Sequence, residues 1–510
     1  MLNQAYRKTA ALSVVVALSM GAAGRTTSLL SDVQRLSLPV EASRVAAYES
    51  NPAQMFYRDS ATISTSSASV DIERMDRPFM EQLGDGHTLL SLRADSYMRL
   101  TGNSVVWGSA AFTTGKYNNI KWSDCIDYLR IAPYVLGDEA GGDLSMRRYT
   151  FTGGYSRRYS SWNFGIDADY RAEIAYRNRD PRVKTIVSDL SLRVGGSRLV
   201  GEYSLGVAAK LNIYNQSCDL DFYSPINQIN TYTLTGMGTF YKRFMGNTNK
   251  NSGYTSYGYS ASVQFLPTGN RGLYAEAGFE GYRMSQQLRS FNNITLGYTD
   301  NKKITASAAY SFRFTEDVTF RPRVSGFVFD RKGTENLFGT SAGMSYDKIG
   351  DRKPYSHSLT GATIELPLQM YYRKSYLTGI LSVSYDQSVE KYSDPRRKLE
   401  ASHIVPFCAI DFSSRFSPVW FYTVGVSTYE SYASSKKPLL AGLDTTEPLG
   451  QCVVSNFDML RADSRGGSIS ASVSRLFNGF AATLSATFNY SNYKDLSDNY
   501  STVVSLSVHF

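Results

Sequence analysis

The most constraining feature of this sequence is the stretch from Ser161 to Arg177, in which every second side chain is apolar. Side chains alternate between the two faces of an extended chain, so the stretch predicts a strand with one apolar and one charged face. It is longer than the roughly five or six residues of an ordinary soluble strand. A tilted strand that crosses a bilayer needs about nine to eleven residues, with apolar side chains outside and polar ones inside. The pattern therefore predicts the wall of a transmembrane barrel.

The start of the chain predicts a secretory signal. Arg7 and Lys8 precede an apolar run from Ala10 to Met20, and small residues follow up to Gly24. A basic start, a short apolar run and a small-residue cleavage site are typical of a signal peptide, here residues 1–24. The alternative is an N-terminal anchor helix, but the run is too short to span a bilayer.

The end of the chain also alternates. It resembles the terminal assembly signal of bacterial outer-membrane barrels, in which an alternating last strand closes on an aromatic residue. The resemblance implies the barrel-assembly machinery as a partner and the bacterial outer membrane as the location. The residues that carry it are Val504, Leu506, Val508 and Phe510.

Composition and charge agree with a barrel. The chain has 37 Tyr, 40 Gly and only 15 Pro, and no apolar run approaches the roughly 18 residues of a spanning helix. A closed barrel satisfies its backbone internally, so its mean hydropathy of −0.28 can resemble that of a soluble protein. The net charge of +9 comes from scattered Lys and Arg, with no DNA- or RNA-binding motif beside them, which argues against nucleic-acid binding. Basic residues could instead meet anionic lipopolysaccharide or an anionic solute, although ordinary solvated charge is the simpler interpretation.

Residues 25–57 and 58–510 differ in pattern. The first range lacks sustained alternation, and we expect a periplasmic or lumen-inserted plug-like segment. The second range holds recurrent alternating ribbons separated by turn residues, which predicts an all-β fold with a single antiparallel barrel. About 21 ribbons can be counted. The expected alternation of short and long loops slips before Gly246, so a strand is missed or overcounted between Asn215 and Arg331. The correction favours about 20 strands, within 18 to 22, with both chain ends in the periplasm.

Charged residues on the inner faces of these ribbons are the candidates for lining the lumen. Such a row of mixed sign could bind a polar solute, or it could cross-link the wall by salt bridges. The second interpretation is favoured, because a wide barrel must satisfy many inward charges. The candidates are Arg93, Asp95, Arg99, Asp167, Asp169, Arg171, Glu173, Arg177, Glu202, Lys210, Glu276 and Glu280.

Catalytic and metal-binding patterns are weak. A lipase would need a Ser next to a base, and His403 beside Ser402 is the nearest candidate, but adjacent residues face opposite sides of a strand. The four cysteines are isolated and form no CxxC pair, so we expect no metal site and no cofactor. A disulfide is permitted, but the spacing names no partners. Residues 122–136 could form a short external cap or an ordinary ordered loop.

Several short motifs resemble an uncharacterised family of outer-membrane barrel proteins from Bacteroides-type gut bacteria, over most of the mature chain. That family carries no established activity, so the resemblance implies no functional residue. Asn51-Pro52-Ala53 is also similar to the start of the long-chain fatty-acid transporter barrels, in which an N-terminal segment plugs the lumen. The motifs of the first family are Trp122 to Asp127, Gly141-Gly142-Asp143, Phe151 to Tyr155, Tyr170-Arg171-Ala172 and Arg179-Asp180-Pro181.

The sequence thus predicts an outer-membrane barrel that lets a small solute pass, or captures it, without chemistry. One alternative is a scaffold barrel whose loops bind a partner protein or a polysaccharide. The other is a membrane-embedded hydrolase, for which the sequence gives little support. The expected partners are outer-membrane lipids with lipopolysaccharide, the assembly machinery and an unidentified solute.

Overall fold

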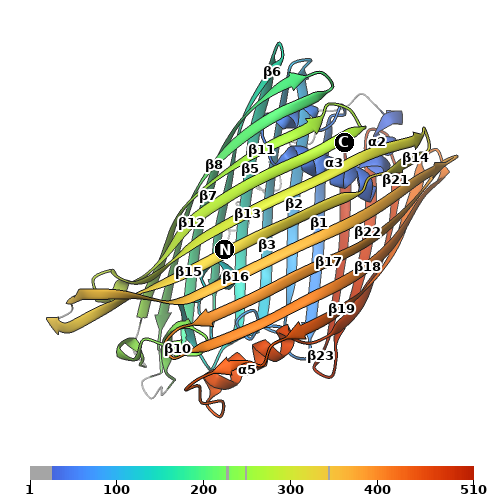
Figure 1. Ribbon diagram of the computed structural model, residues 1–510. Coiled ribbons are helices and arrows are strands. Elements are labelled where there is room, and N and C mark those ends of the chain that lie inside the picture. The colour runs from blue at the N-terminus through green and yellow to red at the C-terminus, as the bar shows by residue number, and fades with distance from the viewer. Residues whose placement is uncertain (1–25, 225–228, 247–249, 343–344) are drawn as a thin grey trace, which may run out of the picture.

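The computed structural model describes residues 26–224, 229–246, 250–342 and 345–510, so the predicted signal peptide lies outside the described residues. The chain forms a closed antiparallel barrel of 18 strands (Figure 1). This count lies within the expected range but below the favoured 20. The wall strands are β1 (Ile63–Met75), β2 (Gly86–Thr101), β3 (Ser104–Ile120), β5 (Gly142–Tyr159), β6 (Trp162–Tyr176), β7 (Arg182–Val200), β8 (Tyr203–Asp221), β11 (Lys250–Pro267), β12 (Gly272–Leu288), β13 (Ile294–Thr315), β15 (Arg323–Ala342), β16 (Ser345–Tyr372), β17 (Ser375–Tyr392), β18 (Arg397–Ser417), β19 (Trp420–Ser435), β21 (Ser464–Leu476), β22 (Ala481–Tyr493) and β23 (Ser497–His509).

The barrel closes where the last strand meets the first. β23 pairs antiparallel with β1 on one side and with β22 on the other. Leu506 lies opposite Ala68, and the backbones of Phe510 and Ser64 exchange two hydrogen bonds. Two short strands, β14 (Val318–Phe320) and β20 (Leu439–Leu440), add to the same sheet at its rims and bring its strand count to 20.

The alternation predicted for residues 161–177 is present in β6. Phe164 and Ile166 are about half exposed on the outer surface, whereas Asp167 and Glu173 are buried on the inner side. The same alternation recurs in the other wall strands, so the outside is apolar and the inside polar. Within the described part of the chain, no helix has the length and apolar content needed to cross a membrane.

The two rims differ in the length of their connections. At one rim, consecutive strands are joined by tight turns, such as the turn at 201–202 between β7 and β8. At the other rim lie the longest connections, which contain helices and a small second sheet. Both the start of β1 and the end of β23 belong to the short-turn rim.

Each rim also carries non-wall elements (Figure 1). The N-terminal helices lie at the short-turn rim, and the second sheet and the last helix lie at the long-loop rim. Pro39 and Pro448 occupy first-turn positions of their helices, where the missing N–H costs no hydrogen bond. These elements are α2 (Thr26–Ser37), α3 (Pro39–Glu49), η1 (Gln54–Tyr57), α4 (Tyr128–Ile131), β4 (Val135–Asp138), β9 (Thr231–Gly236), β10 (Thr239–Phe240), η2 (Lys242–Phe244), η3 (Arg289–Phe291) and α5 (Pro448–Leu460).

The strand predicted to be missed or overcounted between Asn215 and Arg331 falls where the chain leaves the wall. β9 pairs with β4 and β10 in a separate three-stranded sheet. The wall continues directly from β8 to β11, which pair over their whole length. The segment 229–246 therefore contributes to the long-loop end and adds no strand to the barrel.

Candidate functional site

The N-terminal segment, residues 26–57, closes the lumen near the short-turn rim. It contacts the wall through the Asn51-Pro52-Ala53 motif, which is buried. The Asn51 amide donates hydrogen bonds to the Gln264 side chain (2.8 Å) and to the Val207 carbonyl (3.1 Å). The Asn51 side-chain oxygen Oδ1 accepts from the Ala53 N–H at 2.9 Å, which fixes the local turn. This closure agrees with the plug-like segment predicted as part of the fold.

Glycines on three neighbouring strands make room for this motif. A Cβ added at Gly165 would lie 2.3 Å from the Pro52 backbone, and one at Gly195 would lie 1.9 Å from Asn51 Oδ1. A Cβ at Gly206 would lie 2.6 Å from the Gln54 amide. Any larger side chain would collide with the N-terminal segment, so the wall is shaped to receive it.

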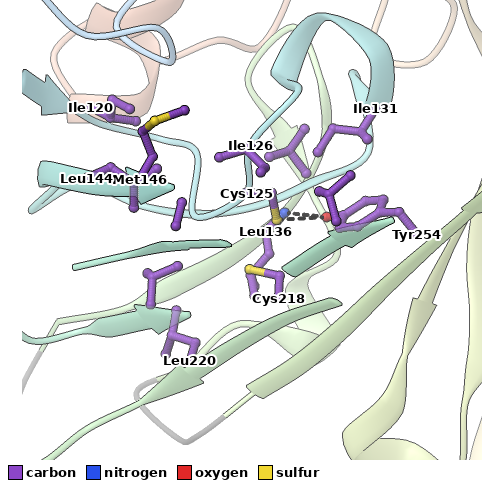
Figure 2. Packing of buried hydrophobic residues seen from close by; sticks show 14 of the residues in the cluster. Ile120, Cys125, Ile126, Ile131, Leu136, Leu144, Met146, Cys218, Leu220 and Tyr254 are labelled. Atoms are coloured by element: carbon purple, nitrogen blue, oxygen red, sulfur yellow. Dashed lines mark hydrogen bonds between the residues drawn. The ribbon is translucent and has the colours of Figure 1, made fainter. Parts of the chain in front are cut away.

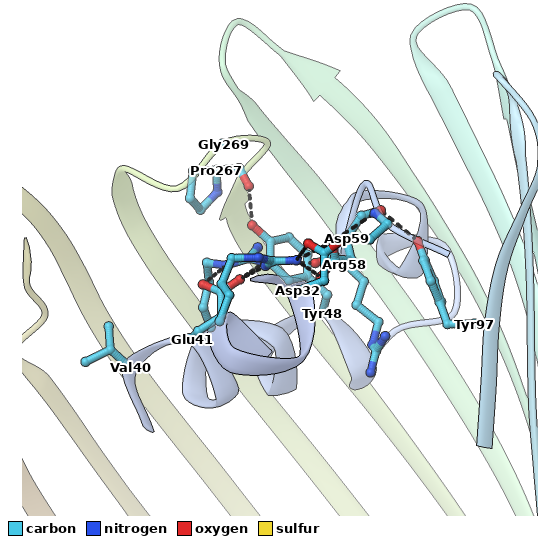
Figure 3. A network of polar contacts seen from close by, with 12 residues as sticks. Asp32, Val40, Glu41, Tyr48, Arg58, Asp59, Tyr97, Pro267 and Gly269 are labelled. Carbon is cyan, nitrogen blue, oxygen red and sulfur yellow. Dashed lines mark hydrogen bonds and ion pairs between the residues drawn. The ribbon is translucent and has the colours of Figure 1, made fainter. Parts of the chain in front are cut away.

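Ion pairs within the N-terminal segment hold its helices together (Figure 3). Arg35 pairs with Asp59 at 2.8 Å and with Glu41, and Arg44 pairs with Glu41 at 2.7 Å. Tyr48 donates from its hydroxyl to the Pro267 carbonyl at 2.7 Å and so joins α3 to the rim.

Two arginines of the wall donate to backbone carbonyls of the same segment. Arg99 bonds to the carbonyls of Phe56 (2.7 Å) and Asp59 (2.8 Å). Arg193 bonds to the Ser50 carbonyl at 3.2 Å and pairs with Asp167 at 2.7 Å. Charged wall residues therefore hold the segment through its backbone, which leaves its side chains free for other contacts.

The opposite end is closed by a cap, made of segments 121–141, 229–246 and 436–463. Trp122, Leu234 and Cys452, one residue from each segment, form a common buried cluster. A larger cluster packs the first segment onto the wall strands, as Figure 2 shows. His403 on β18 contacts Asp386 at 2.9 Å and the Leu460 carbonyl at 2.7 Å, which ties α5 to the wall.

Buried ion pairs fasten the first cap segment to the lumenal wall. Arg171 pairs with Asp127, and Arg130 of α4 pairs with Asp189 at 2.8 Å. Arg331 donates to the Ala132 carbonyl at 2.7 Å. The side chains of these ion pairs are mostly buried, so removing one partner would weaken the charge compensation of the group that remains.

The carboxylates of this cap segment have shifted pKa values. Burial alone would raise the pKa of Asp127, but hydrogen bonds from Arg171 and Tyr214 and the charge of Arg171 outweigh it and lower the pKa. Burial, together with the nearby charge of Asp138, raises the pKa of Asp124 well above its ordinary value. Arg177 contacts both Asp124 and Asp138, so one cation lies between two buried carboxyl groups.

Between the two closures lies a chamber of mixed lining. A cavity of about 560 Å³ adjoins the N-terminal segment and is lined by charged groups, by wall hydroxyls and by apolar side chains such as Met55, Trp107 and Phe421. Arg93 and Asp95 form a two-bonded pair (2.6 and 2.7 Å) and keep about half of their side-chain surface exposed, although both point inward. The hydroxyl groups belong to Ser96, Ser109, Thr152, Ser472, Ser474 and Ser507.

A smaller cavity of about 200 Å³ lies against β8, β11, β12 and β13. Lys210, Glu276, Glu280 and Lys303 line it, and Lys210 pairs with Glu280 at 3.9 Å. An 18-stranded wall encloses more space than inward side chains can fill, which explains why both cavities remain between the closures.

The predicted lumen residues separate into three groups by position. Arg99 and Asp167 act at the N-terminal segment, Arg171, Glu173 and Arg177 at the cap, and the rest face the cavities, with one exception. Glu202 lies exposed in the tight turn between β7 and β8, so its assignment to the lumen wall is corrected. It follows the last residue of β7 in a turn, where strand alternation no longer applies. The cavity-facing group is Arg93, Asp95, Asp169, Lys210, Glu276 and Glu280.

The residues predicted to form the assembly signal lie at the seam. Val504 and Leu506 are about half exposed on the apolar outer face of β23, and Val508 follows on the same strand. The Phe510 ring lies 6.3 Å from that of Phe480. Their role in assembly stays a prediction.

Several functional residues were not identified in the sequence. The glycines at 165, 195 and 206 fall in ribbons already assigned to the wall, and their contacts require the fold. Asp124 and Asp138 lie in a segment without periodicity. His403, the nearest candidate base, has both ring nitrogens engaged, by Asp386 and by a backbone carbonyl. Among the described residues, no cluster of His, Cys, Asp and Glu could hold a metal ion.

Comparison with known proteins gives a family but no activity. The family of unknown function DUF6850 matches residues 52–510, and the chain belongs to it. No curated protein matches. The match begins at the Asn51-Pro52-Ala53 motif and covers every wall strand of the barrel.

Among solved structures, the unliganded ferric citrate transporter FecA is 10% identical, covering 87% of this chain and 78% of its own, with a TM-score of 0.35. A mutant ferric enterobactin receptor PfeA from Pseudomonas aeruginosa is 8% identical, covering 88% and 80%, with a TM-score of 0.36. The copper transporter OprC is 8% identical, covering 87% and 82%, with a TM-score of 0.37. Likeness at this level does not identify a ligand for this chain.

Proposed function

We propose that this protein is an outer-membrane barrel that captures a small polar solute, or lets it pass, in the chamber between the N-terminal segment and the cap. The observation that carries the proposal is the chamber itself, in which charged and hydroxyl side chains face a cavity inside a barrel with an apolar outer surface. The signal peptide, the assembly machinery and contact with lipopolysaccharide belong to the same proposal, as does an origin in Bacteroides-type bacteria.

The lining of the chamber favours an uncharged or zwitterionic solute. Arg93 is paired with Asp95, so the pair carries no net charge, and the hydroxyl groups around it can both donate and accept hydrogen bonds. A solute with several hydroxyl or amide groups would satisfy more of these partners than a simple ion would. Capture requires no reaction, which fits the non-enzymatic role we propose.

Passage would require one closure to move. The N-terminal segment is attached to the wall by hydrogen bonds and by side-chain packing, so its release would open the short-turn end. We assign this end to the periplasm, because barrels have short turns there and longer loops outside. The cap would then face the cell exterior.

Conductance in planar bilayers tests this proposal. We expect the intact protein to conduct little and a variant lacking residues 26–57 to conduct more. In that variant, Arg93→Ala should shift the reversal potential in a KCl gradient toward higher cation selectivity, because it removes a cation from the pathway.

Arg283→Ala is the matched control, because Arg283 pairs with Asp300 at 2.7 Å on the outward-facing side of β12. It should leave the reversal potential unchanged. Equal effects of the two substitutions, or no conductance in any variant, would contradict a pathway through the chamber.

A further inference from the structure

We propose that Cys125 of the cap and Cys218 of β8 form a disulfide in the mature protein, which fixes the cap to the wall. The proposal rests on the proposed outer-membrane location, because assembly there passes through an oxidising compartment. It assigns partners that the spacing of four isolated cysteines could not name.

The geometry places the two cysteines against each other. Both are buried, Cys125 in the first cap segment and Cys218 on the lumenal side of the wall. The Cys218 thiol donates to the Asp124 carbonyl at 2.9 Å, and this carbonyl belongs to the peptide bond that leads into Cys125. The two cysteines belong to the same buried cluster, in which the Cys125 thiol donates to the Tyr254 hydroxyl at 3.5 Å. Figure 2 shows one sulfur projecting from the cap and the other from β8.

Hydrogen bonds around the two cysteines hold the first cap segment against the wall. Thr185, on the neighbouring strand β7, donates to the same Asp124 carbonyl at 3.0 Å. Tyr254 on β11 accepts from the Leu136 N–H at 3.0 Å, which fixes the other side of the cap segment. The Cys218 sulfur therefore already lies against the backbone that leads into Cys125, and a bond requires the two sulfurs to turn toward each other.

The other two cysteines have different surroundings. Cys452 lies on α5, where its sulfur accepts from Gln82 at 3.4 Å and contacts Asn456. Cys408 lies in the middle of β18, among outward-facing apolar residues. Neither is placed against another cysteine in the described part of the chain, so they serve as internal controls.

The reaction is a thiol–disulfide exchange with a protein disulfide of the periplasm as oxidant. The thiolate of one cysteine attacks the oxidant and forms a mixed disulfide, and the second thiolate then displaces the reduced oxidant. Cys125 and Cys218 together lose two protons and two electrons, and the oxidant is reduced to a dithiol. Both sulfurs are buried in the folded protein, so we place the exchange before the cap has closed over the wall.

The disulfide would restrict movement of the cap but not of the N-terminal segment. A covalent link keeps the first cap segment on β8 even when its ion pairs break. The N-terminal segment contains no cysteine, so its attachment stays reversible. The disulfide therefore assigns any opening of the chamber to the short-turn end.

Mass spectrometry of the protein from fractionated membranes tests the proposal. Cells are lysed in N-ethylmaleimide without reductant, and the full-length protein is unfolded and digested. We expect one cross-linked peptide pair that joins Cys125 to Cys218, with Cys408 and Cys452 alkylated. Cys218→Ser should leave Cys125 alkylated, and Cys452→Ser should leave the cross-link intact.

A second measurement reports on the cap. In hydrogen exchange, Cys218→Ser should speed exchange in residues 121–141 and leave residues 26–57 unchanged relative to Cys452→Ser. Alkylation of both Cys125 and Cys218 in protein from the outer-membrane fraction would overturn the disulfide and leave the proposed location standing. Recovery of the protein from the soluble fraction with free thiols would overturn both.

Discussion

At the scale of single residues, the absence of a side chain can matter as much as its presence. Gly195 faces the lumen and lies against Asn51, whereas a Cβ added at its neighbour Gly196 would face outward and lie 3.9 Å from the Phe164 ring. The two positions are adjacent in sequence and opposite in environment. They therefore separate the effect of docking from the effect of a glycine replacement in β7.

We predict that Gly195→Val displaces the N-terminal segment while the barrel stays intact. The added side chain would overlap Asn51, and overpacking of this kind typically costs about 1–3 kcal/mol. Limited trypsin digestion should cut within residues 26–57 faster than in the parent protein. Gly196→Val is the control and should digest at the parent rate; equal rates for the two variants would show that the segment does not dock on this glycine.

A second prediction concerns Asp127, whose carboxylate is held by Arg171 in the cap. Asp127→Asn removes the charge but keeps the shape, so Arg171 loses one carboxylate partner and keeps Glu173 at 3.0 Å. Breaking a buried pair so that a charge is left uncompensated typically costs about 3–5 kcal/mol, and Arg171 keeps a second carboxylate, so we expect a smaller loss. Hydrogen exchange in residues 121–141 should quicken.

The matched control is Asp143→Asn, at the exposed rim of β5. Asp143 pairs with Lys116 at 2.9 Å, and both side chains are about half exposed. An exposed pair of this kind contributes about 0–1 kcal/mol, so exchange in the cap should change little. If Asp143→Asn loosened the cap as much as Asp127→Asn, the Arg171 contact would not be what fastens it.

At the scale of elements, the cap should respond to acid. The pKa of Asp127 is lowered, so its stabilising contribution is complete above the ordinary carboxylate pKa of about 4 and is lost as the pH falls through the lowered value. Asp124 acts in the opposite direction, because burial and the charge of Asp138 raise its pKa. The contribution of Asp127 is therefore measured as the difference in cap hydrogen exchange between the parent protein and Asp127→Asn.

We predict that the difference in cap exchange between the parent protein and Asp127→Asn is constant from about pH 7 to pH 5. Below about pH 4 the difference should shrink, because the parent carboxylate then becomes neutral as well. Hydrogen exchange at matched pH cancels the intrinsic pH dependence of the reaction. A difference that grew on acidification would contradict the sign of the shift.

The helices and strands also show which parts of the fold the sequence pattern could predict. The wall strands could be predicted, because the lipid and the lumen impose a two-residue period that Phe164, Ile166 and Asp167 follow. β9 pairs with β4 and β10 in a separate sheet, and only the tertiary contacts show that these strands are not part of the wall. The inward charges were found for the same reason as the strands. The sequence did not predict which of these charges contact the N-terminal segment, which contact the cap and which face the chamber. That division depends on segments that show no periodicity.

At the scale of the whole molecule, the barrel is defined by which side of the wall meets lipid and which meets water. Leu92 and Arg93 are neighbours on β2, and each is about half exposed, one outside and one toward the chamber. Leu92 is surrounded by other apolar side chains of the outer face, such as Leu90. In a barrel of this kind, the exposed surface of Leu92 contacts lipid and the exposed surface of Arg93 contacts water.

Fluorescence quenching of bimane attached at these two positions tests that requirement most directly. Leu92→Cys and Arg93→Cys are each made in a Cys408→Ala background, and the labelled proteins are placed in bilayers that contain brominated lipid. We predict strong quenching by the lipid at position 92 and little at position 93, with aqueous iodide reaching position 93 better than position 92. Equal quenching at both positions, or the reverse order, would contradict a barrel with lipid outside and a polar chamber within.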